Sequence, residues 1–298
     1  MHNAIETVQK MGCYWFIALH CFFQKAHSVP HLQPFITRML SAFLTVFLAT
    51  TGAKATQFYP LSLDLKGEGQ PVVVFIHGNG SNASAWSNIE PQIRSMGVQT
   101  VVYDRIILDP HPMWEAGYAV EHEAKDLITA LSDLADNAPI ILVAHSYGGY
   151  IASLLVEELE NVQGIVFVDA GIPQDMSAEL VSFVLAEYIP RFEALEKAAP
   201  ELAKTIIPII KAYPATARRM GSVTIPQHLP VIDIVAATSW VKDAKVVAQM
   251  HKAHAEFTAA SPTRTSVFAK GSGHNVMQDK PEYVIEAIKR MVEQVRGK

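Results

Sequence analysis

The fold of this chain is decided by residues 140–150, which read IILVAHSYGGY. An apolar run as long as one buried strand ends in Ser146, and a helix-compatible stretch follows. A sharp strand-to-helix turn of this kind exposes a serine hydroxyl close to backbone N–H donors, and it needs small neighbours because the turn is strained. The usual pattern is Gly-x-Ser-x-Gly, and Ala144 replaces its first glycine with the smallest change available. We therefore predict that Ser146 is a nucleophile.

The composition provides for a sizeable core and argues against several functions. Half of the 298 residues are hydrophobic, and the formal net charge is −5. Nucleic-acid binding is not expected, because contacts to phosphate need an excess of Lys and Arg. Both cysteines, Cys13 and Cys21, precede residue 56, so the remainder of the chain has no disulfide and no cysteine-based metal site. We expect no cofactor and no metal.

Residues 1–55 have the features of a targeting segment. Arg38 precedes an apolar run at 39–49, and the sequence Gly-Ala-Lys-Ala at 52–55 offers a cleavage site of the A-x-A kind. The run is too short to span a bilayer comfortably. We predict a signal peptide at about 38–55, an exported chain (periplasmic or secreted) and no stable membrane association after cleavage.

The part of the chain that precedes this signal is unusual. It contains a second apolar run at 14–23, and we interpret it as lying upstream of a true start at Met39 and so not translated. The alternative is an N-terminal membrane anchor.

Strand-like and helix-like stretches alternate after residue 56. The expected strands are continuous apolar runs, typical of strands buried on both faces; they lie at 71–76, 98–103, 140–143, 164–168, 231–236 and 265–269. The expected helices lie at 86–95, 119–135, 147–159, 241–257 and 281–295. This alternation predicts an α/β domain at 56–298, with a mostly parallel, doubly wound sheet flanked by helices.

Residues 172–228 break the alternation. They contain no convincing strand, and their helical periodicity is interrupted by Pro190, Pro200, Pro208, Pro214 and Pro226. A segment this short and this broken makes a poor independent core. We predict a helical lid at about 172–228 that lies over the carboxyl edge of the sheet and closes an apolar pocket.

A serine nucleophile needs a base, and the base needs an orienting acid. His274 is the predicted base, because it lies in a glycine-containing loop between the last strand and the last helix. Asp169 is the predicted acid, because it ends the strand at 164–168 and ligands of open α/β sheets bind at the carboxyl ends of strands. Asp243 is the alternative acid, and Asp175 is a third candidate; an ordinary helix cap or surface charge is the competing interpretation of each.

Two backbone N–H groups are candidates for binding an oxyanion. The first strand ends in the turn His77-Gly78-Asn79-Gly80, which can direct the N–H of Asn79 toward the point that the N–H of Tyr147 faces. Each donor of this kind is worth roughly 3–4 kcal/mol in acyl transfer. His77 itself is expected to hydrogen-bond the loop rather than to take part in catalysis.

The other histidines are expected to be structural or exposed. Strand alternation points His145 away from the nucleophile. His251 and His254 lie three residues apart on a helix, whereas a zinc pair needs a spacing of four and a third ligand. We therefore predict that both are surface residues.

The chain resembles members of the α/β-hydrolase superfamily from about residue 59 to 295. The resemblance rests on the His77-Gly78 turn with Trp86 downstream, the Tyr103-Asp104-Arg105 strand end, the Ala144–Gly149 turn, and Gly273-His274 with Asp279-Lys280-Pro281 after it. It implies the chain order serine, acid, histidine. The Gly78-Asn79 turn and the place of Asp169 also resemble the haloalkane-dehalogenase branch. That branch uses an aspartate nucleophile, so Ser146 argues against halide displacement.

These observations predict a serine hydrolase acting on small to medium, apolar esters or lactones. The same residues would also serve carbon–carbon bond hydrolysis, amide hydrolysis or cofactor-free perhydrolysis. A different class of function is a non-catalytic protein that holds a small ligand in the pocket. The expected partner is a small ester-like molecule, and the sequence does not predict an oligomeric state.

Overall fold

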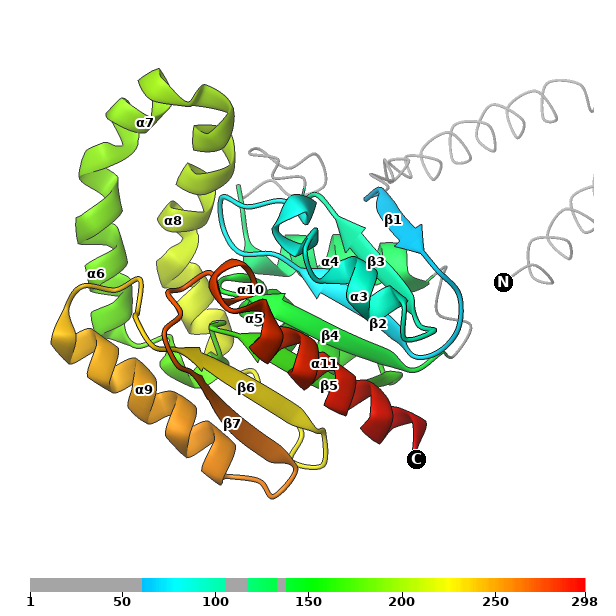
Figure 1. Cartoon of the computed structure of the whole chain (residues 1–298). Helices are drawn as coiled ribbons and strands as arrows, with labels where there is room; N and C mark the ends of the chain where they lie inside the picture. The colour runs from blue at the N-terminus through cyan, green and yellow to red at the C-terminus, as the bar shows by residue number, and fades with distance from the viewer. Residues whose placement is uncertain (1–60, 106–116, 133–137, 298) are drawn as a thin grey trace, which may run out of the picture. The chain divides into compact units, whose positions relative to one another are not determined.

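The computed structural model describes residues 61–105, 117–132 and 138–297, so the predicted signal peptide and the segment before it lie outside the described residues. In these residues seven strands form one sheet, in the order β1-β3-β2-β4-β5-β6-β7 (Figure 1). Only the pair of β1 (Leu63–Lys66) and β3 (Gln99–Tyr103) is antiparallel; the other neighbours run parallel. They are β2 (Val72–Ile76), β4 (Ile140–His145), β5 (Val162–Val168), β6 (Val231–Ala236) and β7 (Arg264–Ala269). The predicted mostly parallel α/β sheet is therefore confirmed.

Strand β2 shows why its sequence is apolar throughout. All five of its residues are buried, and successive side chains enter different cores. Val72, Val74 and Ile76 belong to the core on one face of the sheet, whereas Val73 and Phe75 belong to the core on the other. A strand with both faces covered has no position for a polar side chain.

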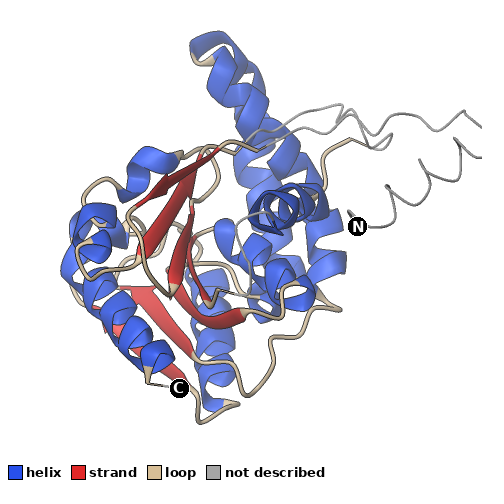
Figure 2. Cartoon of the chain, turned by 90° about the vertical axis from the view of Figure 1, so that its right-hand side faces the viewer, coloured by secondary structure: helices blue, strands red, loops and turns tan. Residues whose placement is uncertain are grey.

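Helices cover both faces (Figure 2). The first core is closed by α4 (Val120–Ser132) and α5 (Gly148–Glu158), and the second by α3 (Glu90–Arg94) and α11 (Pro281–Arg296). Helix α9 (Ala244–Ala259) packs on β6 and β7, and the short α10 (Val276–Asp279) precedes α11.

Two local predictions differ from the structure. The helix expected at 86–95 is split into a 3-10 helix, Ala83–Trp86, and α3, because Ile89 and Pro91 start a new helix after a short turn. Strand β1 was not predicted; it is a four-residue edge strand with no fully buried residue, so its sequence carries little apolar signal.

Residues 169–230, between β5 and β6, contain helices and turns but no strand, as expected. The helices are α6 (Ala178–Tyr188), α7 (Phe192–Ala198) and α8 (Pro200–Met220), and we call them the insertion. The expectation that Pro208 and Pro214 interrupt the helical pattern was wrong, because both lie inside α8. A proline inside a helix costs about 3 kcal/mol, and the buried contacts of Ile209 and Ile210 beside Pro208 offset that cost. Whether the insertion acts as a lid stays a prediction.

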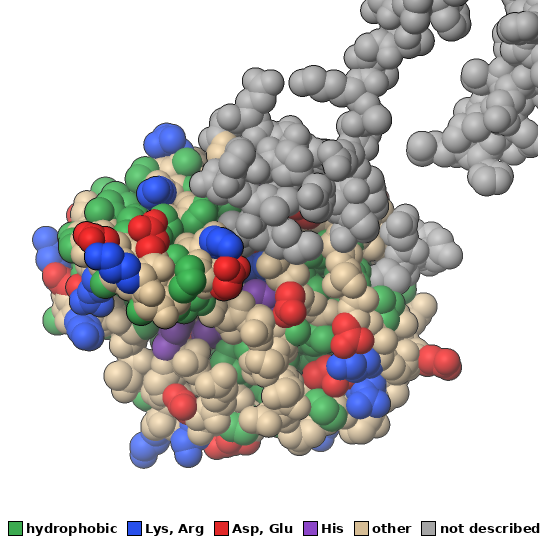
Figure 3. Space-filling model, turned by 90° about the horizontal axis from the view of Figure 1, so that it is seen from above, with side chains coloured by type: hydrophobic (Ala, Val, Ile, Leu, Met, Phe, Trp, Pro, Cys, Tyr) green, Lys and Arg blue, Asp and Glu red, His purple; other side chains and the backbone are tan. Residues whose placement is uncertain are grey.

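The outer part of the insertion is strongly charged. Its ion pairs join residues three or four apart along the helices: Arg191–Glu187, Lys197–Glu193 and Lys204–Glu201. Figure 3 shows acidic and basic side chains interspersed on the described part of the upper face. Among the described residues, we find no helix with the length and hydrophobicity of a membrane span.

Candidate active site

The turn between β4 and α5 positions Ser146 at the carboxyl edge of the sheet. Ser146 follows the last residue of β4 and adopts φ +52°, a left-handed conformation that is strained for a residue with a side chain. The helix that follows packs closely: a Cβ on Gly148 would lie 2.7 Å from the carbonyl oxygen of Ile76, and one on Gly149 would lie 2.1 Å from that of Gly171. The glycines are required because backbone occupies the space that a side chain would need.

The structure brings Ser146, His274 and Asp169 together from three separate loops. His274 Nε2 lies 2.9 Å from Ser146 Oγ, and His274 Nδ1 lies 2.6 Å from Asp169 Oδ2. A carboxylate only accepts hydrogen bonds, so Nδ1 carries the proton and Nε2 is free to accept the proton of the hydroxyl. The three side chains thus form the hydrogen-bonded chain that nucleophilic catalysis by serine requires.

Asp169 is held firmly in this arrangement. Its backbone is left-handed (φ +43°), and its N–H donates to the carbonyl of Ile234 at 2.7 Å. Its Oδ1 accepts the N–H of Ala236 at 2.9 Å, which leaves Oδ2 for His274. Asp243, the alternative acid, instead caps the N-terminus of α9 by accepting the N–H groups of Lys245 and Val246.

The turn that follows β2 lies directly against Ser146. A Cβ on Gly78 would lie 2.8 Å from the Cβ of Ser146, so the backbone of Gly78 passes beside the nucleophile and Asn79 follows it directly. Neither the N–H of Asn79 nor that of Tyr147 has a protein acceptor among the described residues. Both stay candidates for binding an oxyanion.

Arg105 holds that turn in place, a role that the sequence analysis did not assign to it. Its Nη1 and Nη2 donate to the carbonyls of His77 and Gly78 at 3.1 and 3.2 Å, and its guanidinium lies 5.8 Å from the ring centre of Tyr147. Because the C=O and N–H of one peptide point in opposite directions, holding the Gly78 carbonyl also orients the N–H of Asn79. The buried carboxylate of Glu123 pairs with Arg105 at 3.2 Å. Arg105 follows β3 closely, so the strand-end rule could have found it.

His77 hydrogen-bonds the loop, as expected. Its Nδ1 lies 3.1 Å from the carbonyl of Gly78, and its Nε2 accepts the N–H of Arg105 at 3.4 Å. Burial, together with the charge of Arg105, lowers the pKa of His77 to about 3, so the ring is neutral.

His145 does not point away from the site, and that prediction was wrong. Its Nε2 donates to the carbonyl of His274 at 3.1 Å, and the two rings lie 4.6 Å apart. Strand alternation fails here because Ser146 has a left-handed backbone and no longer continues the strand. Burial first, and then the charge of His274, lowers the pKa of His145 well below its ordinary value. A neutral His145 therefore supports the loop that carries His274.

His254 is also not a surface residue, although His251 is exposed as predicted. His254 is 7% exposed, and its Nδ1 donates to the fully buried Asp233 at 2.8 Å. The spacing of the histidines could not reveal this, because the partner comes from β6. Within the described part of the chain, no group of three His, Cys, Asp or Glu side chains could hold a metal ion.

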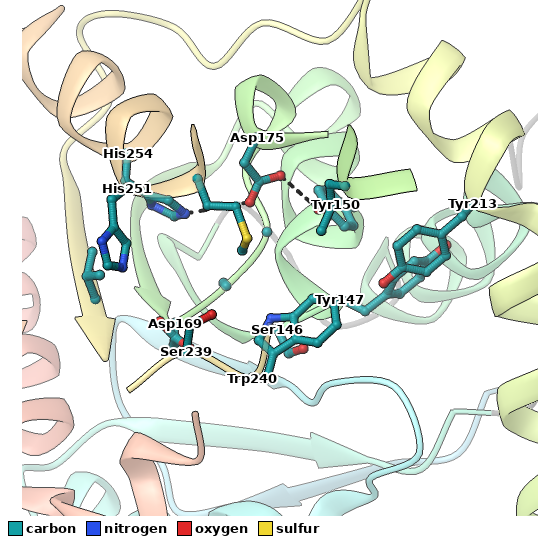
Figure 4. A pocket seen from close by; sticks show the side chains of 15 residues that line it. Ser146, Tyr147, Tyr150, Asp169, Asp175, Tyr213, Ser239, Trp240, His251 and His254 are labelled. Atoms are coloured by element: carbon teal, nitrogen blue, oxygen red, sulfur yellow. Dashed lines mark hydrogen bonds and ion pairs between the residues drawn. The ribbon is translucent and has the colours of Figure 1, made fainter. Parts of the chain in front are cut away.

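A pocket opens beside Ser146 and Asp169 (Figure 4). It encloses about 520 Å³ of empty space when its open mouth is counted. The insertion contributes Leu180 and Tyr213 to its wall. The expected apolar lining is only part of the wall, because the buried polar side chains of Asp175 and His254 also reach it.

Comparison with known proteins identifies the family of this chain. The model of the alpha/beta hydrolase family matches residues 73–287. An alpha-hydroxynitrile lyase of Arabidopsis thaliana is 28% identical over 119 residues, which are 39% of this chain and 45% of the relative. A non-heme chloroperoxidase of Kitasatospora aureofaciens is 39% identical over 87 residues, which are 28% of this chain and 30% of the relative. The chain thus spans less than half the length of these curated relatives.

Solved structures agree with the fold. The mouse alpha/beta hydrolase domain-containing protein 10 superposes with a TM-score of 0.58 and 18% identity, over 81% of this chain and 97% of that one. At this identity the likeness supports the fold alone. The extent of the family match, together with the seven-stranded sheet, supports a hydrolase role and shows that the chain belongs to the alpha/beta hydrolase family.

Proposed function

We propose that this protein is a serine hydrolase that cleaves carboxylic esters or lactones of small to medium size. The observation that carries the proposal is the hydrogen-bonded chain from Ser146 through His274 to Asp169 at the carboxyl edge of the sheet. Two of these side chains, Ser146 and Asp169, line a pocket that opens beside them.

The reaction would proceed in two stages. Ser146 Oγ attacks the carbonyl carbon while His274 Nε2 takes the hydroxyl proton; the leaving alcohol then takes that proton as the C–O bond breaks. Water repeats the sequence on the acyl-serine, which releases the acid and restores Ser146. Asp169 keeps the proton of the ring on Nδ1 and stabilises the imidazolium that forms in each stage.

The negative oxygen of each tetrahedral intermediate would bind the N–H groups of Asn79 and Tyr147. Their lack of a protein acceptor, and the close approach of Gly78 to Ser146, support this role. Donors that are already oriented stabilise developing charge without reorganisation, and each is worth roughly 10²–10³ in kcat.

The test begins with the nucleophile. Purified protein should react stoichiometrically with a fluorophosphonate and hydrolyse p-nitrophenyl esters, and lactones should be assayed in parallel. Ser146→Ala should abolish labelling and lower kcat by about 10⁶-fold. Ser153→Ala is the matched control, because that buried hydroxyl donates to the carbonyl of Gly149 within α5, away from the site. A Ser146→Ala variant with full esterase activity would overturn the proposal.

Cofactor-free perhydrolysis is the second candidate. A curated relative that is 39% identical over 87 residues is named a non-heme chloroperoxidase, and the same acyl-serine could be attacked by hydrogen peroxide instead of water. Formation of a peracid from acetate and peroxide, measured by halide oxidation, distinguishes the two reactions.

The same assays would reveal three other functions. Hydrolysis of carbon–carbon or amide bonds would appear as turnover of those substrates in preference to esters. A protein that binds its ligand without turnover would not react with the fluorophosphonate. We further propose that the mature chain is exported, because residues 38–55 have the pattern of a signal peptide. We also propose that the reaction needs no cofactor, since His274 and Asp169 would supply the base and the acid.

A further inference from the structure

A chain of buried polar side chains forms one wall of the pocket. Tyr150 Oη donates to Asp175 Oδ1 at 2.8 Å, and His254 Nδ1 donates to Asp233 Oδ2 at 2.8 Å. His254 Nε2 faces Asp175 Oδ2 across 3.6 Å. Figure 4 shows Asp175 between Tyr150 and His254, with Ser146 and Trp240 on the opposite side of the view. We call Tyr150, Asp175 and His254 the polar wall.

One carboxylate oxygen of the polar wall, Asp175 Oδ2, makes an ion pair with His254 but no hydrogen bond within the described part of the chain. The separation of 3.6 Å exceeds hydrogen-bond distance, and Asp175 Oδ2 has no hydrogen-bond partner among the residues that the structure describes. The side chain of Asp175 is only 1% exposed. A buried carboxylate oxygen without a hydrogen bond is costly, so a donor that reached it from the pocket would be stabilised.

His254 lies between two acidic side chains, Asp175 and Asp233. Burial alone would lower the pKa of His254, but the carboxylates of Asp233 and Asp175 outweigh burial and raise it to about 10. The imidazole is therefore protonated at neutral pH. The imidazolium thus lies between the side chains of Asp233 and Asp175.

The polar wall lies in the pocket that Ser146 opens into. Of the described residues, Ser146 and Asp169 line this pocket but His274 does not. His274 delivers the proton to the leaving alcohol in the proposed reaction, so the alcohol lies outside the pocket and the acyl group inside. Apolar side chains, among them Leu180, Val235 and Met250, share the rest of the lining with other polar side chains such as Ser239 and His251.

We propose that the polar wall is a subsite for a hydrogen-bond donor, a hydroxyl or an ammonium group, on the acyl part of the substrate. The preferred substrates are then esters of hydroxy- or amino-substituted acids rather than purely aliphatic esters. Asp175 Oδ2 accepts the hydrogen bond. This proposal rests on the serine hydrolase activity proposed above.

The first experiment uses the wild-type protein. Methyl esters of acids with four to eight carbons are prepared with a methyl, hydroxyl, methoxy or ammonium group at the far end, and hydrolysis is followed by acid release. At one chain length the hydroxyl or ammonium ester should exceed its methyl counterpart in kcat/KM by about tenfold or more, the size expected of one hydrogen bond to a charged group. The methoxy ester, which has no donor, should show no such gain.

The second experiment separates an effect on substrate recognition from an effect on stability. Both are possible because the polar wall also joins α5, α9 and the turn before α6. Asp175→Asn should remove most of the preference for the ammonium ester and reduce that for the hydroxyl ester. Tyr150→Phe removes the neighbouring hydrogen bond but keeps the carboxylate, so it should retain the preference. Asp64→Asn, an exposed position on β1, is the matched control. If the polar wall has a purely structural role, both wall variants lose stability. The kcat/KM for the hydroxyl or ammonium ester, relative to that for the methyl-terminated ester, then stays unchanged.

Two results would overturn the subsite. One is that the wild-type protein hydrolyses methyl-terminated esters at least as well as the hydroxyl and ammonium esters at every chain length. This test needs no variant. The other is a preference that Asp175→Asn leaves unchanged. If no ester is hydrolysed in a manner that depends on Ser146, the proposed function itself fails, and the subsite falls with it.

Discussion

The turn around Ser146 and the insertion lie on the same pocket but differ in almost every physical respect. Around Ser146 the backbone is packed so closely that Gly78, Gly148 and Gly149 have no room for a methyl group. The insertion has Ile189 and Leu202 exposed and carries its ion pairs in solvent. The first region leaves little freedom for sequence change, whereas the second leaves much.

This difference separates chemistry from specificity. A nucleophile, a base and oxyanion donors must be held within fractions of an ångström, which rigid packing provides. The groups that select a substrate need only line the pocket. Leu180 and Tyr213 come from the insertion, and Asp175 comes from the turn that leads into it. The contrast is therefore testable by changes on either side of the pocket.

The largest effect in this comparison should come from the acid. Asp169→Asn should lower kcat by about 10⁴-fold, because the carboxamide no longer holds the proton of His274 on Nδ1. Steady-state kinetics on the best ester measures it. Asp243→Asn should leave kcat within twofold, as expected of a helix cap, and the reverse pattern would transfer the role of the acid to Asp243.

Arg105 should have the next largest effect. Arg105→Lys keeps the charge beside Glu123 but loses the fork that holds two carbonyls, so kcat should fall roughly 10- to 100-fold with KM little changed. Affinity for a trifluoromethyl ketone, which forms a tetrahedral adduct, should weaken by a similar factor. Arg94→Lys provides the control, because the exposed Arg94 also pairs with a buried carboxylate, that of Glu90 on α3. Equal losses of affinity for the ketone and for a ground-state ligand would argue against this role.

His254 should make stability depend on pH. Its pKa in the folded chain is raised to about 10 from an ordinary value of 6.5. Its stabilising contribution is therefore complete below about pH 6.5 and is lost as the pH rises toward 10. The free energy of unfolding in urea should fall over this range for the wild type and less steeply for His254→Gln. Parallel curves for the two proteins would show that the ion pair adds no stability.

The exposed pairs of the insertion should have the smallest effect. Lys197→Ala removes the pair with Glu193 on α7, and the free energy of unfolding should change by no more than about 0.5 kcal/mol. A loss of several kcal/mol in thermal or urea unfolding would contradict the contrast between the two regions.

Much of the fold could be predicted because its signals are local. Each buried parallel strand is a continuous apolar run, and the serine turn has its own pattern of small residues. The strand-end rule also selected Asp169, and the structure places its carboxylate within hydrogen-bond distance of His274. Strand β1 and the course of α8 through its prolines had no such signal, because tertiary packing stabilises them.

The sequence by itself determined the α/β architecture, the exposed serine and the residues at each strand end, since these depend on periodicity and on turn chemistry. Only the tertiary structure decided that His145 and Arg105 support the site and that His254 is buried beside Asp233 and Asp175. Their partners lie up to 129 residues away along the chain. The physical reason is that a long-range hydrogen bond leaves no periodic trace in sequence: it depends on where the sheet brings two distant loops together.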